Sequence, residues 1–181
     1  MRSITHIVLH HTAAEEKDTE QIRRYHMSLG WRDIGYDYVI EKDGKIVTGR
    51  SLDITGAHAG VAYYNQHAIG IAVIGNLIRR EIYDAQYAAL VHLVDRLVRE
   101  HNIPLSNILL HREIKQTACP GTLPRDRLIA DLDNQAIRHL HQLGIMASPD
   151  YWLIHAKPGQ MVKGEYAAGL IRKFSDYLRR R

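Results

Sequence analysis

The sequence contains a single cysteine, Cys119, and is poor in glycine and proline, with 13 Gly and 5 Pro among 181 residues. One cysteine excludes a disulfide within the chain, and therefore the small secreted folds that depend on such bonds. The low glycine and proline content, together with 45% hydrophobic residues, excludes fibres and intrinsic disorder. The length suits one domain of ordinary size with a small addition.

Long apolar runs are also missing from the sequence. No segment approaches the ~18 consecutive apolar residues of a membrane-spanning helix. The first residues, 1–6, lack the apolar stretch of ~7–15 residues that a signal peptide needs. We therefore expect cytoplasmic synthesis, where a lone thiol stays reduced and is able to bind a metal.

Acidic residues are slightly fewer than basic ones: the sequence has 20 Asp and Glu and 24 Lys and Arg, which gives a net charge of +4. Such a balance suits an anionic polymer as partner, although we expect no nucleic acid partner. Residues 172–181 hold five basic residues and one acidic residue, which accounts for the whole surplus. A run of this kind is more often a solvated helix end than a binding site.

The first part of the chain alternates between strand and helix patterns. Residues 4–9 are β-branched and apolar, which predicts a buried strand, and the apolar run 68–75 predicts a central strand covered on both faces. Asp43-Gly44 lies between the strand patterns 36–40 and 45–48, which predicts a hairpin. Further patterns predict a short strand at 108–110 and helices at 19–29, 84–101 with Asp84 as N-cap, and 124–132. Together these elements indicate an α/β fold with a central mixed β-sheet flanked by helices.

Strand patterns stop after Asp133, where only short helical patterns remain. They cover 134–143, 148–154 and 165–178. We predict a catalytic domain at 1–133 and a small all-helical C-terminal module at 134–181. A module of this size is marginal by itself, so we expect it to pack on the first domain or on a second copy.

Potential metal ligands stand at the ends of predicted elements. His10 and His11 follow the first strand, His111 follows the strand at 108–110, and Cys119 lies in the next loop. Zinc prefers imidazole nitrogen and thiolate sulfur. Because neighbouring strand residues point to opposite faces, only one of His10 and His11 is expected to face a metal. The spacing alone is not specific: each histidine is also compatible with an ordinary packed imidazole, and Cys119 with a small buried hydrophobe.

Five segments together resemble a known family. They are 7–13, 30–40, 56–60, 65–71 and 111–121, and they occur in the same order in the zinc amidases of the phage amidase-lysozyme and peptidoglycan recognition protein group. That group cleaves the bond between N-acetylmuramic acid and L-alanine in bacterial peptidoglycan. The resemblance covers roughly residues 4–133 and implies a Zn²⁺ cofactor and a peptidoglycan substrate.

The resemblance also implies roles for individual residues. His10, His111 and Cys119 match the zinc ligands, and Tyr36 matches the catalytic tyrosine. Thr117 matches a position where phage members often have lysine and recognition-protein amidases often have threonine. The spacing does not support Lys115 as a replacement for that lysine.

Substrate contacts are expected from a further group of residues in the matching segments. These are His58, Asn65 and His11, of which His58 matches a position in the substrate cleft. An exposed loop imidazole is the simpler alternative for His58.

The function implied by the resemblance is that of an N-acetylmuramoyl-L-alanine amidase, of the kind encoded as a prophage endolysin and released to the wall by a holin. One alternative is a recognition module that binds wall fragments without cutting them, which the presence of Cys119 disfavours. Another is an amidase that also regulates a partner such as RNA polymerase. A glycosidase with paired carboxylates is conceivable, but no Asp or Glu pair stands out.

The C-terminal module has three open interpretations. Tyr151-Trp152 and the aromatic face of the last helix point to wall targeting or self-association. The basic residues of 172–181 point to contact of an amphipathic helix with an anionic envelope surface. The third interpretation is a helical extension that packs on the catalytic domain.

Overall fold

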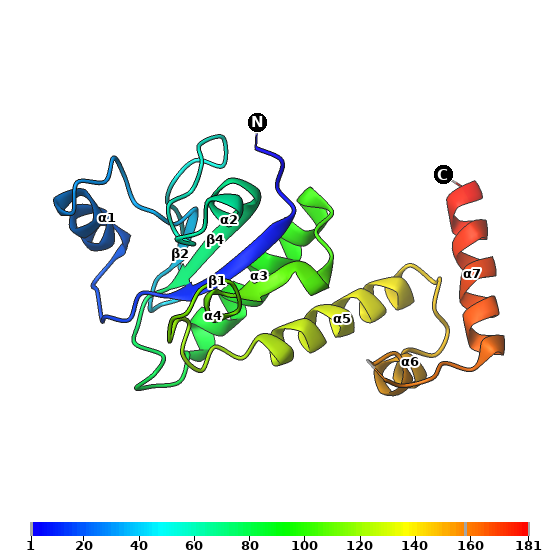
Figure 1. Cartoon of the computed structure of the whole chain (residues 1–181). Coiled ribbons are helices and arrows are strands. Elements are labelled where there is room, and N and C mark those ends of the chain that lie inside the picture. The colour runs from blue at the N-terminus through cyan, green and yellow to red at the C-terminus, as the bar shows by residue number, and fades with distance from the viewer. Residues whose placement is uncertain (1, 158, 181) are drawn as a thin grey trace. The chain divides into compact units, whose positions relative to one another are not determined.

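The computed structural model describes residues 2–157 and 159–180. Strands and helices alternate up to residue 114, and only helices follow (Figure 1). In chain order the elements are β1 (His6–His11), α1 (Thr19–Ser28), β2 (Tyr38–Ile40), β3 (Ile46–Thr48), α2 (Ala62–His67), β4 (Ala68–Val73), α3 (Asp84–His101), a 3-10 turn (Leu105–Asn107), β5 (Ile108–Leu110), α4 (His111–Ile114), α5 (Arg125–Gln142), α6 (Pro149–His155) and α7 (Gly164–Arg179).

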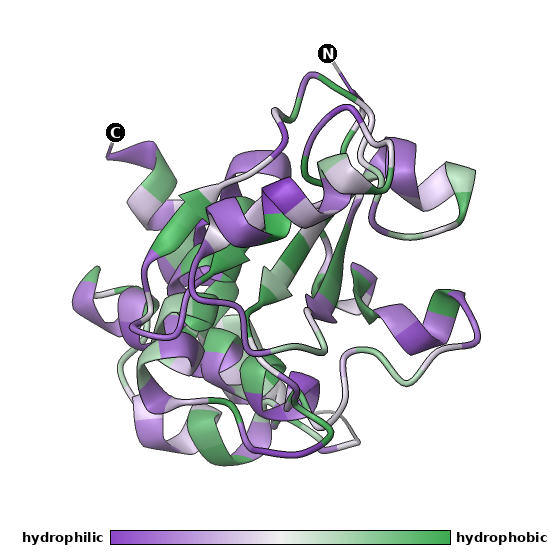
Figure 2. Cartoon of the chain, turned by 90° about the vertical axis from the view of Figure 1, so that its left-hand side faces the viewer, coloured by the Kyte–Doolittle hydropathy of each residue, from purple (hydrophilic) through white to green (hydrophobic). Residues whose placement is uncertain are grey.

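The strands form one mixed sheet in the order β3-β2-β4-β1-β5. β1 runs parallel to both β4 and β5, β2 runs parallel to β4, and only β3 is antiparallel to its neighbour. Every residue of β4 is buried, as expected of a central parallel strand covered on both faces. Figure 2 shows the hydrophobic colouring of the central strands. The predicted α/β fold with a central mixed sheet flanked by helices is confirmed.

The hairpin predicted around Asp43-Gly44 is present. β2 and β3 pair antiparallel, with Ile40 opposite Ile46. Gly44 has a φ of 87°, a left-handed conformation that glycine adopts at no steric cost. The strand β2 begins at Tyr38, so Tyr36 precedes it instead of opening it as the pattern predicted.

Helix α3 packs on the sheet beside β2 and buries an apolar stripe that includes Leu90, Val94 and Leu97. Its predicted start is shifted by one residue. Tyr83, not Asp84, is the N-cap, and the Gln86 side chain accepts a hydrogen bond from the Tyr83 amide at 3.4 Å. A glutamine three residues after the cap is a common way to pair an amide that the helix itself leaves unpaired.

Helix α5 differs from the prediction. The sequence pattern gave two helices, at 124–132 and 134–143, whereas α5 is continuous from Arg125 to Gln142. Neither glycine nor proline occurs within it, so nothing breaks the helix at Asp133. Asp133 is half-buried, and burial raises the pKa of its carboxyl.

The chain forms two compact units, residues 1–125 and 126–181. The division falls in the first turn of α5, so a functional boundary between 133 and 134 stays a prediction. None of the helices in the described residues is long and apolar enough to cross a membrane.

The second unit has its own apolar cluster, built around Ile137, Met146 and Trp152. Tyr151 stacks on Tyr166 with ring centroids 3.9 Å apart, and its hydroxyl accepts a hydrogen bond from the Lys163 amide at 2.8 Å. The aromatic pair Tyr151-Trp152, which suggested wall targeting, is thus used in packing this unit.

Candidate metal centre

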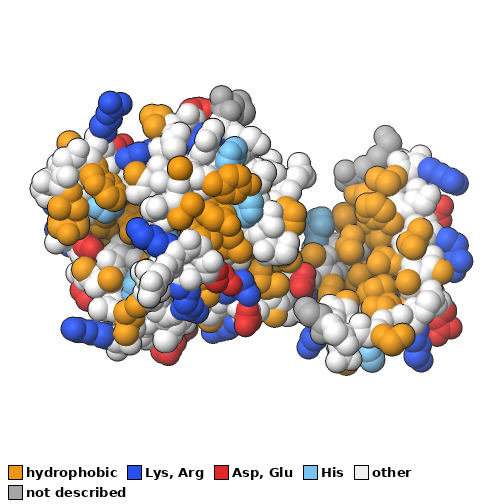
Figure 3. All heavy atoms as spheres, in the orientation of Figure 1, with side chains coloured by type: hydrophobic (Ala, Val, Ile, Leu, Met, Phe, Trp, Pro, Cys, Tyr) orange, Lys and Arg blue, Asp and Glu red, His pale blue; other side chains and the backbone are white. Residues whose placement is uncertain are grey.

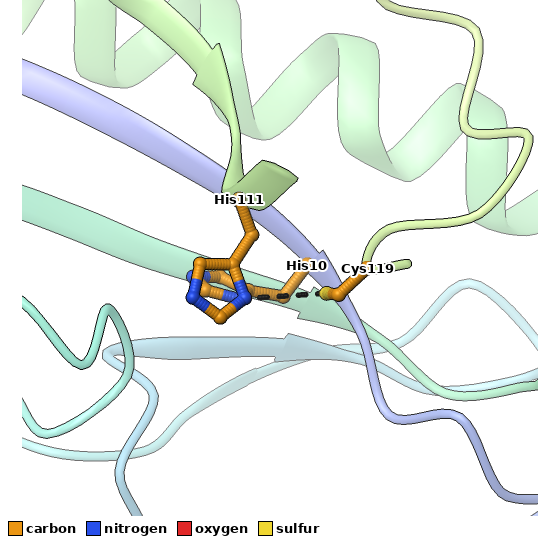
Figure 4. A group of neighbouring side chains, drawn as sticks. All are labelled: His10, His111 and Cys119. Carbon is orange, nitrogen blue, oxygen red and sulfur yellow. Dashed lines mark hydrogen bonds between the residues drawn. The ribbon is translucent and has the colours of Figure 1, made fainter. Parts of the chain in front are cut away.

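His10, His111 and Cys119 meet at one edge of the sheet. Leu9 of β1 lies opposite Leu110 of β5, so the next residues along the chain, His10 within β1 and His111 just after β5, lie side by side. Their ring centroids are 4.4 Å apart. One ligand atom from each of the three residues lies within 4.8 Å of the others. Figure 4 shows the two imidazoles and the thiol pointing toward one another.

The loop after α4 carries the cysteine back to this edge. The Thr117 side-chain oxygen accepts a hydrogen bond from the Cys119 amide at 3.2 Å, and the Cys119 sulfur accepts one from the His11 amide at 3.4 Å. Gly121 has a φ of 67°, and any side chain there would collide with the backbone of Leu77. Close packing against Leu77 therefore fixes the path of the loop.

The second nitrogen of each histidine ligand has a partner within the protein. His111 Nε2 lies 3.0 Å from the Ala59 carbonyl oxygen. Since a carbonyl only accepts, this nitrogen carries the proton, and Nδ1 is left as the ligand atom. His10 Nε2 lies 3.0 Å from His58 Nδ1, while His10 Nδ1 lies 3.7 Å from the Cys119 sulfur. Metal-binding histidines are commonly held in this way through their other nitrogen.

The donor set fits zinc. Tetrahedral zinc, with metal–nitrogen bonds of ~2.0 Å and metal–sulfur bonds of ~2.3 Å, separates nitrogen from sulfur by roughly 3.5 Å. The His10–Cys119 distance of 3.7 Å agrees with this value. Two imidazoles and one thiol also leave the fourth position free, as in catalytic zinc sites.

Burial sets the protonation of these groups. It lowers the pKa of His10 well below its ordinary value, and neighbouring histidines lower it further. It also lowers the pKa of His111, so both imidazoles are neutral, as ligands must be. Burial raises the pKa of the Cys119 thiol to about 11, so a bound cation is needed to hold the thiolate at neutral pH.

Tyr36 lies beside the cluster. Its ring centroid is 5.3 Å from that of His10, and the residue packs against the apolar cluster formed by Ile22, Ile34, Val39 and Ile74. Burial raises the pKa of the phenol, and the charges of Cys119 and Glu16 raise it further. The phenol therefore keeps its proton and acts as a hydrogen-bond donor at neutral pH.

His11 points away from the cluster, as the alternation of strand residues predicted. Its Nδ1 accepts a hydrogen bond from the Leu77 amide at 3.0 Å, and the residue is buried. This imidazole joins two segments of the backbone, and its proposed contact with substrate stays a prediction that this position does not support.

His58 and Asn65 were also expected to contact substrate, but both make internal contacts. The His58 side chain is fully buried, so it is neither an exposed loop imidazole nor accessible to substrate in this conformation. The Asn65 side-chain oxygen accepts hydrogen bonds from the amides of His58 and Ala59, at 3.0 and 2.8 Å. Asn65 thereby shapes the loop that holds His58.

Lys115 lies nearer to the cluster than its spacing from Cys119 indicated. Its amine rests against Gly60, where any side chain would collide with it. Burial lowers the pKa of His111, the hydrogen bond that His111 donates to the Ala59 carbonyl raises it, and the Lys115 charge lowers it further. A cation is therefore present on this side of the site, although Lys115 itself is exposed.

Asp37 and Arg2 were not predicted as residues of the site. Asp37 is buried and forms an ion pair with Arg2, with Arg2 Nη2 3.2 Å from Asp37 Oδ1. The available signal was a charged residue within an otherwise apolar and aromatic segment, Tyr36 to Ile40. A charge in such a position is buried only when it is paired.

Comparison with known proteins places this arrangement in a family. The family described as N-acetylmuramoyl-L-alanine amidase, Amidase_2, matches residues 1–122. Peptidoglycan-recognition protein SC2 of Drosophila melanogaster is 37% identical over 129 residues, which are 66% of this chain and 69% of that protein.

Solved structures agree with the sequence match. N-acetylmuramoyl-L-alanine amidase LysC from Clostridium intestinale superposes with a TM-score of 0.68 at 33% identity, covering 72% of this chain and 86% of that chain. A variant of Drosophila PGRP-LB in complex with tracheal cytotoxin has a TM-score of 0.58 at 28% identity, covering 67% and 77%. The chain therefore belongs to the Amidase_2 family of N-acetylmuramoyl-L-alanine amidases and peptidoglycan recognition proteins.

Proposed function

We propose that this chain is a zinc-dependent N-acetylmuramoyl-L-alanine amidase, which hydrolyses the amide bond between N-acetylmuramic acid and L-alanine in peptidoglycan. The observation that carries the proposal is the convergence of His10, His111 and Cys119, with both histidines oriented through their second nitrogens. A recognition module needs no such ligand set.

These three residues would hold a zinc ion, which when bound would supply Lewis acidity toward the amide carbonyl and toward water. Tyr36, which is partly buried and keeps its proton because burial raises its pKa, donates a hydrogen bond to the carbonyl oxygen as negative charge develops there. The Thr117 oxygen already accepts a hydrogen bond from the Cys119 amide, so its hydroxyl proton is available as a second donor. Ala59 and His58 hold the two imidazoles in place.

The proposal is tested with purified protein and peptidoglycan. We expect zinc bound in a 1:1 ratio and the release of new L-alanine amino termini, both lost in His111→Ala. Binding of wall fragments without release of amino termini would favour the recognition module instead.

We further propose that the enzyme serves as an endolysin that is made in the cytoplasm and reaches the wall after the membrane is permeabilised, as by a holin. Support comes from the similarity, at 33% identity, to the endolysin amidase LysCS of Clostridium intestinale. Expression with and without a holin tests this role: lysis is expected only with the holin.

For the second unit we propose contact with an anionic envelope surface. Ile171, Phe174 and Leu178 of α7 are exposed by 69%, 45% and 58%, and Figure 3 shows hydrophobic side chains gathered on one face of this unit. Arg172, Lys173 and Arg179 lie on the same helix, whereas Arg181 lies outside the described residues. Vesicles containing anionic lipid are expected to bind the wild type more strongly than Ile171→Glu; an unchanged affinity with a halved solution mass would indicate self-association.

A further inference from the structure

A row of buried polar side chains lies behind the metal centre. It runs from His10 to His58, Asp37 and Arg2. His10 Nε2 is 3.0 Å from His58 Nδ1, His58 Nε2 is 3.8 Å from Asp37 Oδ2, and the side chains of His58 and Asp37 are both fully buried. Arg2, whose side chain is 4% exposed, lies 3.2 Å from Asp37 Oδ1. Polar groups this deeply buried are costly unless they are paired.

The hydrogen-bond roles along the row follow from the ligand atom of His10. Because His10 Nδ1 faces Cys119, its Nε2 carries the proton and donates a hydrogen bond to His58 Nδ1. His58, which accepts at Nδ1, then carries its own proton on Nε2, the nitrogen that faces Asp37. Among the described residues, this buried Nε2 has no partner within hydrogen-bond distance. The Asp37 carboxylate at 3.8 Å is the charged acceptor that faces it, and the Ala68 backbone, whose hydrogen bonding opposes the lowering of the His58 pKa by burial, is a second acceptor beside the ring.

The backbone around His58 is shaped to hold its ring. A side chain at Gly70 of β4 would collide with the His58 ring, and a side chain at Gly56 would meet the same ring from another position. Gly70 also donates a hydrogen bond from its amide to Asp37 Oδ2 at 2.7 Å. One glycine thus leaves space for the imidazole and at the same time fixes the carboxylate.

Arg2 fixes the far end of the row. Besides Asp37, its guanidinium donates to the carbonyl oxygens of Ile54, Asn65 and Ala68, at 3.0, 3.1 and 3.2 Å. Asn65 in turn accepts hydrogen bonds from the amides of His58 and Ala59. One loop therefore carries both groups that contact the second nitrogens of the histidine ligands, namely His58 and the Ala59 carbonyl. Hydrogen bonds connect this loop to the Arg2–Asp37 pair.

We propose that Asp37 and His58 form a positioning dyad that fixes the orientation and tautomer of His10, so that Nδ1 is the atom presented to zinc. The inference rests on the proposed zinc function. It goes beyond that function by assigning a role to two residues that touch neither metal nor substrate. Partners of this kind typically change metal affinity by ~10–100-fold when they are removed.

The test compares two substitutions of one residue. Asparagine can place its side-chain oxygen where His58 has Nδ1, and so can still accept the His10 proton, whereas leucine has a similar shape and no acceptor. We expect His58→Leu to weaken zinc binding, measured by chelator competition, by ~10–100-fold, and His58→Asn to restore most of the affinity. Asp37→Asn, which keeps the shape but removes the charge, is expected to lie between them.

A matched control separates metal binding from general stability. Gln86 is fully buried and donates hydrogen bonds to the carbonyl oxygens of Ile74 and Ile40, at 2.8 and 3.4 Å. Gln86→Leu is expected to lower the free energy of unfolding of the metal-free protein and to leave zinc affinity unchanged. A His58→Leu protein that loses stability like Gln86→Leu but binds zinc like the wild type would overturn the proposal.

Two further results keep the test decisive if the leucine variant does not fold. Nitrogen-15 NMR of the zinc-loaded wild type is expected to show His58 neutral, with its proton on Nε2; a proton on Nδ1 would contradict the dyad. A ~10–100-fold loss of zinc affinity in His58→Asn alone, which keeps the acceptor, would also contradict it. A wild-type chain that binds no zinc would instead overturn the proposed function, and the dyad with it.

Discussion

His10 Nδ1 and Cys119 Sγ lie 3.7 Å apart although the two residues are 109 positions apart in the sequence. Their approach depends on two features of the fold: the parallel pairing of β1 with β5, and the loop that returns from α4. Neither residue makes a site alone. The pair, completed by His111, provides the nitrogen and sulfur donors on which the proposed chemistry depends.

Replacing the cysteine ligand is expected to remove the metal. Cys119→Ser exchanges a soft thiolate for a weakly binding hydroxyl. Zinc affinity should therefore fall by more than the ~10–100-fold that is lost when only a hydrogen-bond partner of a ligand is removed. Zinc content after dialysis measures the effect. Ala118→Ser, an exposed neighbour in the same loop, is the control and should retain zinc; full zinc content in Cys119→Ser would refute the assignment of the ligand.

Tyr36→Phe is expected to separate catalysis from metal binding. The phenol is a protonated donor, and removal of one donor to a developing oxyanion typically lowers kcat by ~10²–10³-fold. Zinc content should not change. Tyr38→Phe, in β2, provides the matched control with wild-type kcat. If Tyr36→Phe kept full kcat, the phenol would have only a packing role.

His11 is expected to contribute to stability and not to metal binding. His11→Leu removes the acceptor of the buried Leu77 amide and should lower the free energy of unfolding by about 1–3 kcal/mol. Urea denaturation measures this loss. Zinc stoichiometry should stay at one ion per chain, and loss of the ion in this variant would show that His11, not His10, faces the metal.

Glu15 is expected to make stability depend on acidity. Partial burial raises the pKa of its carboxyl, but a hydrogen bond from the Asn76 amide and the cations Arg80 and Lys42 outweigh this effect and lower the pKa from 4.5 to about 2. A carboxyl pKa that is lower in the folded state stabilises the fold at pH values above the ordinary carboxyl pKa. This contribution disappears as the pH falls toward 2.

The variant Glu15→Gln checks this dependence. Because Glu15 is partly exposed, with 47% of its side chain accessible, the variant should lose less than about 1 kcal/mol at pH 7. The difference from the wild type should shrink as the pH falls from 4.5 toward 2. A constant difference over that range would contradict the ion-pair origin.

The sequence predicted the scaffold of the site better than its inner contacts. The apolar run before His10 and the short strand before His111 were sufficient to predict the two strands that carry these histidines, whereas their parallel pairing was not predicted. The position of Cys119 depended on the resemblance, because the return of its loop is set by packing of Gly121 against Leu77, which no local pattern encodes.

Contacts between distant side chains were the part that could not be predicted. The sequence around His58 is typical of a loop residue between glycines, but in the fold its ring lies against Gly70, where a side chain would collide with it. Asp37 was not singled out, since its partner Arg2 is 35 residues away. The split predicted in α5 had a different cause: Asp133 and Asn134 interrupt the apolar pattern, but an 18-residue helix tolerates two polar residues at its centre.

The most direct test of the central claim is mass spectrometry of the fragments that the purified chain releases from peptidoglycan, with and without a strong zinc chelator. The proposed function predicts peptides with a free L-alanine amino terminus and glycan strands with intact N-acetylmuramic acid, both absent with the chelator and restored by added zinc. Cleavage between sugars, or release of the same peptides in the presence of the chelator, would contradict a zinc-dependent amidase.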